Sequence, residues 1–478
     1  MLTSIFHRNG RLKARSTDTA GTAQGGPVQG STRPALGGSR CRGAIGAVTL
    51  LAALLAGGSL AATETKLALP SAHQAAWQDY ELGMFIHFAP NTWLDQEYDD
   101  LSKPLAEIKP EALDTEQWAR VAESMGAKYL VFVAKHVGGF CWWQTDTTKY
   151  GVKELAWRGG KADLMADLSA SCRKRGIKLG VYLSPNDRFL GAGVGGRIDD
   201  PAKQEDYRKI FRQQLTELLS RYGEIKEVWF DGSLVFDVGD ILHQHAPDAV
   251  VFQGPQASIR WVGNEDGTAP YPAWNTVKFG KKAWGIYTAE DADPEGDRWL
   301  PNECDARMRN TWFWRTDNLP TLKTMDQLMD MYDRSVGRGA VLLLNNTPDK
   351  SGLIPEPDAR RSAEFGAEIK RRYGTAVIDT AGTGGLTEMG LSAPRQINAI
   401  VTMEDITQGE RVREYVVEGR VNGAWQALAK GTAIGHKRID KFEPVEVSEL
   451  RLRVTRSAAK PVIRRFAAYW IAPSPAAR

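Results

Sequence analysis

The sequence is poor in cysteine and in net charge, and each shortage excludes a class of protein. The 478-residue chain has four cysteines, too few for a disulfide scaffold. Its 61 basic and 58 acidic residues leave a formal net charge of only +3. Several of the basic residues precede residue 43, so the folded part has no cationic excess for binding nucleic acid. The remaining class is a globular protein of ordinary composition, with no nucleic acid as its partner.

Apolar segments long enough for a membrane are also scarce, and the one candidate lies near the N-terminus. Residues 1–42 are rich in Gly, Ser, Thr, Arg and Pro, and we expect a disordered tail or a segment upstream of the true start. Residues 43–62 are uncharged, have a short leucine-rich centre and end in small residues that a signal peptidase could cut. We therefore expect a secretory signal peptide and a secreted or periplasmic protein without a stable membrane partner. The alternative is an uncleaved anchor, which Gly57 and Gly58 disfavour.

The cysteines and histidines do not have the spacing of a metal site. After removal of a signal peptide, Cys141, Cys172 and Cys304 remain, and their spacings match no zinc pattern. An odd count permits one disulfide at most, and we expect buried free thiols. His243 and His245 lie at an expected helix end, so we assign neither of them as a ligand. The sequence thus predicts no metal.

Short apolar runs alternate with amphipathic stretches from residue 75 to residue 373. The expected strands are residues 84–88, 129–135, 179–183, 228–230, 250–252 and 341–344, and the expected helices are residues 115–125, 163–175, 205–221 and 324–335. Near-continuous apolar strands separated by helices are typical of parallel strands buried on both faces. A length of about 300 residues suits a (β/α)₈-like barrel, also called a TIM barrel. The alternative is a doubly wound sheet, but no glycine fingerprint follows the first strand.

The pattern changes after residue 374. Residues 375–478 alternate Val, Ile and Leu with polar neighbours at 397–401, 413–419 and 449–454, and Gly and Asn turns interrupt them. This alternation predicts a small antiparallel β-sandwich. The expected fold class is therefore an α/β barrel followed by a C-terminal antiparallel β-sandwich.

Polar side chains close four expected strands in succession, where the active sites of such barrels lie. These side chains are His87, His136, Tyr182 and Asp231. A single residue of this kind is usually a capping group, but four in succession combine hydroxyl-binding groups with a carboxylate. The chain also has 15 tryptophans, which serve either a large core or a sugar-binding surface. The set suits a sugar, because aromatic faces pack on its C–H surfaces while polar groups bind its hydroxyls.

Glycoside hydrolysis requires two carboxyl groups, one as nucleophile or base and one as proton donor. Asp231, in the WFDG segment at 229–232, is the candidate nucleophile at the C-terminal end of a strand. Glu265, in the RWVGNEDG segment at 260–267, is one candidate for the donor. Glu303 is the other, just before the aromatic residues at 312–314. The residues alone leave both candidates open.

Five segments carry motifs that point to one family. They are residues 81–88 (ELGMFIHF), 134–143 (AKHVGGFCWW), 172–176 (CRKRG), 180–185 (GVYLSP) and 229–232 (WFDG). Together they resemble the α-L-fucosidases of glycoside hydrolase family 29. The segments at 260–267, 335–338 and 342–345 resemble the branch of that family that prefers α-1,3/1,4-linked fucose. The match covers about residues 75–375, and the C-terminal part is similar to the carbohydrate-binding-like domain of that branch.

The resemblance implies a retaining exo-α-L-fucosidase that uses no cofactor. Asp231 would attack the anomeric carbon and form a glycosyl-enzyme. Glu265, at the matching position of an Arg-Trp-x-Gly-x-Glu motif, would protonate the leaving oxygen and later activate water. The partner would be a fucosylated oligosaccharide or glycoconjugate. The positions that match sugar-binding residues are His87, His136, Tyr182, Trp229, Arg260 and Glu97.

The chain departs from the family pattern at two positions. Val137 stands where the family has a second adjacent histidine after His136. Loss of one hydrogen bond to the sugar costs about 0.5–1.5 kcal/mol, too little to abolish activity, but a related sugar such as L-galactose could then be tolerated. Asn186 stands where the branch often has Trp, and this bears on the linkage. The alternatives are therefore a related α-L-glycosidase and a catalytically silent sugar-binding protein on the same scaffold.

Overall fold

The computed structural model describes residues 66–280, 282 and 285–473. The expected tail at 1–42 and the expected signal peptide at 43–62 lie outside these residues. No helix among the described residues is long and apolar enough to cross a membrane.

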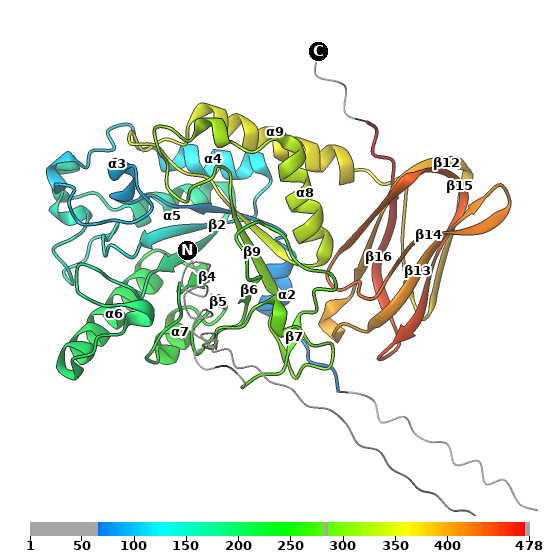
Figure 1. The fold of residues 1–478 in the computed structure, drawn as a ribbon, viewed down its shortest axis with the longest axis horizontal. Coiled ribbons are helices and arrows are strands. Elements are labelled where there is room, and N and C mark those ends of the chain that lie inside the picture. Colours follow the sequence, from blue (N-terminus) through cyan, green and yellow to red (C-terminus); the bar gives the residue numbers. More distant parts are fainter. Residues whose placement is uncertain (1–65, 281, 283–284, 474–478) are drawn as a thin grey trace, which may run out of the picture. The chain divides into compact units, whose positions relative to one another are not determined.

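Eight parallel strands form a nearly closed barrel (Figure 1). They are β1 (Leu82–Ile86), β2 (Tyr129–Lys135), β3 (Lys178–Leu183), β4 (Ile225–Trp229), β5 (Val250–Phe252), β6 (Arg260–Trp261), β9 (Asn302–Arg307) and β10 (Val341–Asn345). Their order is β5-β4-β3-β2-β1-β10-β9-β6. An isolated parallel bridge between Phe252 and Ile259 links β5 to the residue before β6. The predicted fold class is confirmed, and the strands expected at 129–135 and 250–252 have the bounds that the apolar runs predicted.

Helices precede and connect the barrel strands. They are α2 (Ala72–Gln78), α3 (Asn91–Leu94), α4 (Thr115–Met125), α5 (Leu164–Arg175), α6 (Pro201–Arg221), α7 (Gly239–His245), α8 (Met325–Ser335) and α9 (Glu356–Tyr373). Side-chain oxygens of Asp114, Asp163 and Asp200 accept backbone N–H groups at the starts of α4, α5 and α6. These caps explain why each helix begins immediately after an aspartate in the sequence.

Close packing inside the barrel depends on a glycine in β1. A Cβ atom at Gly83 would lie 2.3 Å from the ring of Tyr129 on β2. Only glycine therefore lets this tyrosine ring lie across β1. All five residues of β1 are buried, as are all seven of β2, because helices cover one face and the barrel interior the other.

The C-terminal strands form one six-stranded antiparallel sheet. They are β11 (Ile378–Thr383), β12 (Leu386–Glu404), β13 (Val412–Val421), β14 (Ala424–Gly431), β15 (Arg438–Ser457) and β16 (Val462–Tyr469), and a separate pair is β7 (Thr276–Val277) with β8 (Arg298–Trp299). Register shifts between β12 and β15 bend these long strands, so that the sheet curls around an apolar core of its own. The predicted antiparallel class is confirmed, with one curled sheet in place of two facing sheets.

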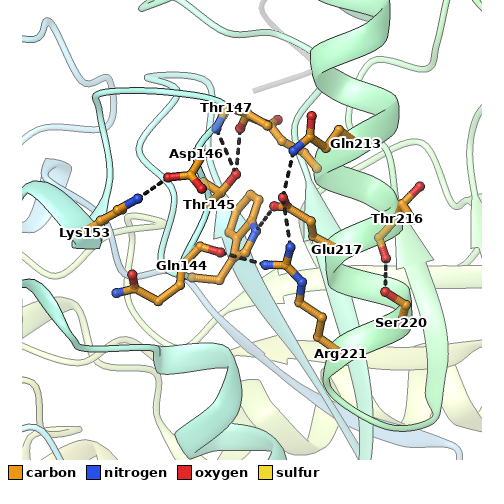
Figure 2. A network of polar contacts seen from close by, with 12 residues as sticks. Gln144, Thr145, Asp146, Thr147, Lys153, Gln213, Thr216, Glu217, Ser220 and Arg221 are labelled. Carbon is orange, nitrogen blue, oxygen red and sulfur yellow. Dashed lines mark hydrogen bonds and ion pairs between the residues drawn. The ribbon is translucent and has the colours of Figure 1, made fainter.

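A polar network fixes the loop after β2 to helix α6 (Figure 2). Glu217 on α6 accepts hydrogen bonds from Trp143 Nε1 at 2.9 Å and from Gln213 at 3.1 Å, and it pairs with Arg221 at 3.1 Å. Arg221 also donates to the carbonyl oxygen of Gln144 at 2.8 Å. The network therefore holds the segment that follows the strand end at which a site histidine was expected.

A buried ion pair also fixes the C-terminal end of β2. Nζ of Lys135, the last residue of β2, lies 2.9 Å from Asp187 Oδ2 and donates to Gln214 Oε1 at 3.0 Å. Both charged side chains are buried, and their pairing offsets the cost of removing the two charges from water. The end of β2 is thus held to the loop that follows β3.

Candidate active site

Asp231 is presented by a tight turn directly after β4. Gly232 has a φ of 79°, which glycine adopts freely, and its N–H donates to Gln253 Oε1 at 3.0 Å. The hydroxyl of Tyr182, on β3, donates to Asp231 Oδ2 at 3.0 Å. Burial raises the pKa of Asp231, the Tyr182 hydrogen bond opposes this shift, and the charge of Glu265 adds to it. The carboxylate is therefore shielded from water and is stabilised by one hydroxyl donor.

Glu265 lies in the loop after β6, and its side chain is 10% exposed. Its Oε2 accepts a hydrogen bond from Trp312 Nε1 at 3.3 Å and lies 3.4 Å from Arg307 Nη1. The charge of Glu265 adds to the raised pKa of Asp231, and the charges of both carboxylates add to the raised pKa of Tyr98. The structure therefore brings the two predicted catalytic carboxylates to one site.

Aromatic rings from successive strands line this site. The ring of His136 stacks on that of Tyr182 at a centroid distance of 5.9 Å and an angle of 20°, and Tyr182 stacks on Trp229 at 5.9 Å and 24°. His87 lies 5.8 Å from His136, and its Nδ1 is 2.9 Å from Asn345 Oδ1. His136 Nδ1 is buried and has no hydrogen-bond partner among the described residues. The row of rings thus offers aromatic faces and an imidazole nitrogen for a ligand.

Both imidazoles are neutral at physiological pH. Burial lowers the pKa of His87 to about 3, and the charge of Arg307 adds to that shift while the bond to Asn345 opposes it. Burial, followed by the nearby His87, holds the pKa of His136 well below its usual value. A neutral imidazole has one donor and one acceptor nitrogen, which suits binding to sugar hydroxyls.

Glu97 lies beside the site and holds an aromatic segment. Both of its carboxylate oxygens accept the backbone N–H of Trp312 at 3.1 Å. Burial raises the pKa of Glu97, whereas the N–H groups of Trp312 and Phe313 and the charge of Arg307 lower it. The structure therefore joins Glu97 to the ring that binds Glu265, while direct contact with a sugar stays a prediction.

Arg260 is placed differently from the other predicted sugar-binding residues. Its guanidinium is buried, donates to Asn302 Oδ1 at 2.9 Å and also bonds the carbonyl oxygen of Trp274. Burial lowers the pKa of Arg260 to about 10, and the charges of Glu410 and Asp291 oppose the shift. Among the described residues, Arg260 donates hydrogen bonds to Asn302 and to the carbonyl oxygen of Trp274, and to none of the other predicted site residues.

Glu303 lies inside the barrel beneath Trp229. It is fully buried and accepts hydrogen bonds from Tyr129 at 2.7 Å and from Trp229 Nε1 at 2.8 Å. Burial and the charge of Glu227 hold the pKa of Glu303 well above its usual value. Both oxygens of Glu303 therefore accept hydrogen bonds from barrel side chains, whereas Glu265 contacts Trp312 and Arg307; the choice of Glu265 as proton donor stays a prediction.

The structure adds residues that the sequence analysis did not select. Arg307 ends β9, pairs with Glu265 and lies 5.3 Å from the Trp312 ring. Asn345 ends β10, binds His87 and donates to the carbonyl oxygen of Trp312 at 2.9 Å. Asn345 is a polar residue that follows an apolar run, and the same pattern selected His87, His136, Tyr182 and Asp231. This pattern could therefore have identified Asn345 from the sequence. Arg307 gave no such signal, because its strand is polar in sequence.

The described residues contain no group of three or more His, Cys, Asp or Glu side chains that could hold a metal ion. Cys141, Cys172 and Cys304 are buried free thiols, as predicted.

A parallel barrel whose strand ends bring two carboxylates together among aromatic and imidazole rings has the architecture of a glycoside hydrolase. Residues 94–373 match the family described as alpha-L-fucosidase. Alpha-L-fucosidase 1 of Arabidopsis thaliana is 32% identical, over 84% of this chain and 88% of its own. A crystal structure from Bacteroides thetaiotaomicron is 33% identical with a TM-score of 0.80, covering 85% of this chain and 100% of that one. A glycoside hydrolase family 29 fucosidase of Ruminococcus gnavus, solved in complex with fucose, is 26% identical with a TM-score of 0.74, covering 84% and 95%.

The chain belongs to the α-L-fucosidase family, glycoside hydrolase family 29, and hydrolyses fucosyl residues.

Proposed function

We propose that the protein is a retaining exo-α-L-fucosidase that removes terminal α-L-fucosyl groups from oligosaccharides or glycoconjugates. Asp231 is the nucleophile and Glu265 the acid/base. The observation that supports these roles is the hydrogen bonding of both carboxylates by residues at the strand ends, Tyr182 donating to Asp231 and Trp312 to Glu265. The fucose bound by the Ruminococcus gnavus relative supports the choice of sugar.

In the first step, an oxygen of Asp231 forms a bond to the anomeric carbon while the bond to the leaving oxygen breaks. Glu265 gives its proton to that oxygen, so the leaving group departs as a neutral alcohol. Trp312 and Arg307 hold Glu265 Oε2 in place through their contacts at 3.3 and 3.4 Å. Positioning of the acid is thus built into the loops after β6 and β9.

In the second step, Glu265 takes a proton from water, and the water oxygen displaces Asp231 from the anomeric carbon. Two inversions return the original configuration, so the first product is α-L-fucose. Proton NMR during the first minutes of hydrolysis measures the anomer directly. Initial release of the β anomer would contradict the retaining mechanism.

Replacement of the nucleophile is the main test. We expect Asp231→Gly to lose nearly all turnover of 4-nitrophenyl α-L-fucoside while it still binds fucose, because the glycosyl-enzyme no longer forms. Asp240→Asn, at an exposed carboxylate on α7, is a matched control that keeps its activity. An Asp231→Gly enzyme with more than a tenth of the unsubstituted rate would rule out this nucleophile.

Azide distinguishes the two candidates for the acid/base. An aryl fucoside with a good leaving group forms the glycosyl-enzyme without protonation, and azide then replaces the water that lacks its base. We expect azide to restore turnover of Glu265→Ala and to give α-fucosyl azide. Rescue of Glu303→Ala, and not of Glu265→Ala, would move the assignment to Glu303.

Linkage, sugar tolerance and location complete the proposal. The segments at 260–267 and 335–338 resemble those of α-1,3/1,4-specific relatives, and Val137 after His136 suits an enzyme that also accepts α-L-galactosides. The uncharged stretch at 43–62 directs the chain out of the cytoplasm. A panel of fucosylated oligosaccharides with α-1,2, α-1,3, α-1,4 and α-1,6 linkages tests the linkage, and N-terminal sequencing of the exported protein tests the leader.

A further inference from the structure

Tyr98 presents an exposed aromatic ring on the loop that contacts the Glu265 side of the site. It lies in the loop after β1, next to Glu97, and is 46% exposed. Burial of its hydroxyl raises the pKa of Tyr98, and the charges of Glu97, Glu265 and Asp231 add to the shift. Glu97, which precedes Tyr98, accepts the backbone N–H of Trp312, and the ring of Trp312 donates to Glu265. The loop that carries Tyr98 is therefore joined to the side of the site where Glu265 lies.

Phe189, in the loop after β3, is a second exposed aromatic residue on a connected part of the rim. It is 41% exposed, and one ring face stacks on Tyr150 at a centroid distance of 5.2 Å and an angle of 14°. Its backbone N–H donates to the carbonyl oxygen of Gly138 at 3.2 Å. The ring is thus held in a fixed orientation although much of its surface faces solvent.

Asp99 ties the two aromatic loops together. Its Oδ2 accepts a hydrogen bond from the Tyr150 hydroxyl at 2.7 Å, and its carbonyl oxygen accepts one from Arg188 Nη1 at 2.5 Å. Arg188 precedes Phe189, and its positive charge acts on the hydroxyl of Tyr98. An exposed guanidinium therefore lies on the same rim as the two aromatic residues.

We propose that Tyr98 and Phe189 form a binding platform for the sugar that leaves from the fucosyl group, with Arg188 as its hydrogen-bonding group. This inference rests on the proposed function. The oxygen that Glu265 protonates stays attached to the leaving group, so the leaving group must lie over the rim next to Glu265. A pyranose ring has an apolar C–H face that packs on an aromatic ring and hydroxyls that accept from a guanidinium.

The test compares two substrates that differ only in the leaving group. α-L-Fucosyl fluoride releases fluoride, which cannot cover the platform, whereas α-1,3-fucosylated N-acetyllactosamine releases a sugar. We expect Tyr98→Ala to lose at least tenfold more in kcat/KM on the oligosaccharide than on the fluoride. Phe189→Ala loses in the same direction, while Tyr98→Phe keeps most of the oligosaccharide rate because it keeps the ring.

Trp470→Ala is the control, since this residue is also an exposed aromatic, at 37%, but follows the last strand of the C-terminal sheet. It should leave both substrates unaffected. Equal losses of Tyr98→Ala on the two substrates, or no loss on the oligosaccharide, would overturn the platform. Failure of the unsubstituted enzyme to hydrolyse the fluoride would instead refute the proposed function, and the platform with it.

Discussion

Tyr182→Phe tests how the protein tunes its nucleophile. The substitution removes the hydroxyl that donates to Asp231 Oδ2 at 3.0 Å. It keeps the phenyl ring, which stacks on His136 and on Trp229. Burial raises the pKa of Asp231, and this hydrogen bond opposes the shift. The variant therefore removes the opposing contribution and leaves the burial unchanged.

The size of the effect follows from the kind of bond that is lost. A hydrogen bond to a charged group contributes roughly 1.5–3 kcal/mol. Since one pKa unit corresponds to about 1.4 kcal/mol, the pKa of Asp231 should rise by about 1–2 units further. The nucleophile acts as a carboxylate, so the enzyme loses activity as the pH falls through this pKa. The acidic limb of the profile of kcat/KM against pH should therefore move up by about 1–2 units.

The assay is the hydrolysis of 4-nitrophenyl α-L-fucoside at closely spaced pH values, with each variant checked for folding by circular dichroism. Tyr222→Phe is the matched control, because Tyr222 donates to Asp163 Oδ2 at 2.8 Å at the start of α5. It loses a tyrosine–aspartate bond of the same kind without touching Asp231. An acidic limb that stays in place in Tyr182→Phe, or that moves to lower pH, would refute the reasoning.

Three further predictions concern stability. Asp358→Ala leaves the buried guanidinium of Arg309 without the carboxylate that it contacts at 2.8 and 2.5 Å, and should lower the free energy of unfolding in urea by about 3–5 kcal/mol; a loss below 1 kcal/mol would contradict this. Burial holds the pKa of Glu303 well above the unfolded value of about 4.5, so its protonated form stabilises the fold most below that pH and the benefit is lost as the pH rises. Above pH 4.5, the unfolding free energy of Glu303→Gln should therefore fall less steeply than that of the unsubstituted protein. Parallel curves of unfolding free energy against pH for the two proteins would contradict this. Gly83→Ala should cost about 1–3 kcal/mol by thermal unfolding, because its methyl group overlaps the Tyr129 ring.

The strands that the sequence revealed are those in which apolar residues occupy both faces. All the residues of β2 and of β10 are buried, so a continuous apolar run predicted each of them. The strand β9 (Asn302–Arg307) escaped prediction because it is buried and yet polar. Its acidic side chains accept hydrogen bonds from strands that are distant in the sequence, as when Glu303 accepts from Tyr129 and Asp305 from Trp261. Local sequence does not show such partners.

Local sequence also failed to show which distant side chains meet at the site. The position of Asp231 followed from its place after an apolar strand, and a motif supplied Glu265. The motif also suggested an arginine at its first position, but β6 has two residues, and the direction of the Arg260 side chain depends on contacts with Asn302 and Trp274. The arginine beside Glu265 is Arg307, which comes from a strand that was not recognised.

Several acids of the barrel and its loops share one electrostatic property, which therefore cannot identify the reactive one. Burial is the largest cause of the raised pKa of Glu97, Glu227, Asp231, Glu303 and Asp305. Their partners differ. Both oxygens of Glu97 and both of Glu303 accept hydrogen bonds from protein donors. Within the described part of the chain Asp231 accepts one such bond, on Oδ2. Glu227 and Asp305 likewise accept one such bond each, so an oxygen without a protein donor does not by itself identify the nucleophile. What distinguishes Asp231 is its place just after β4, where the hydroxyl of Tyr182 donates to it.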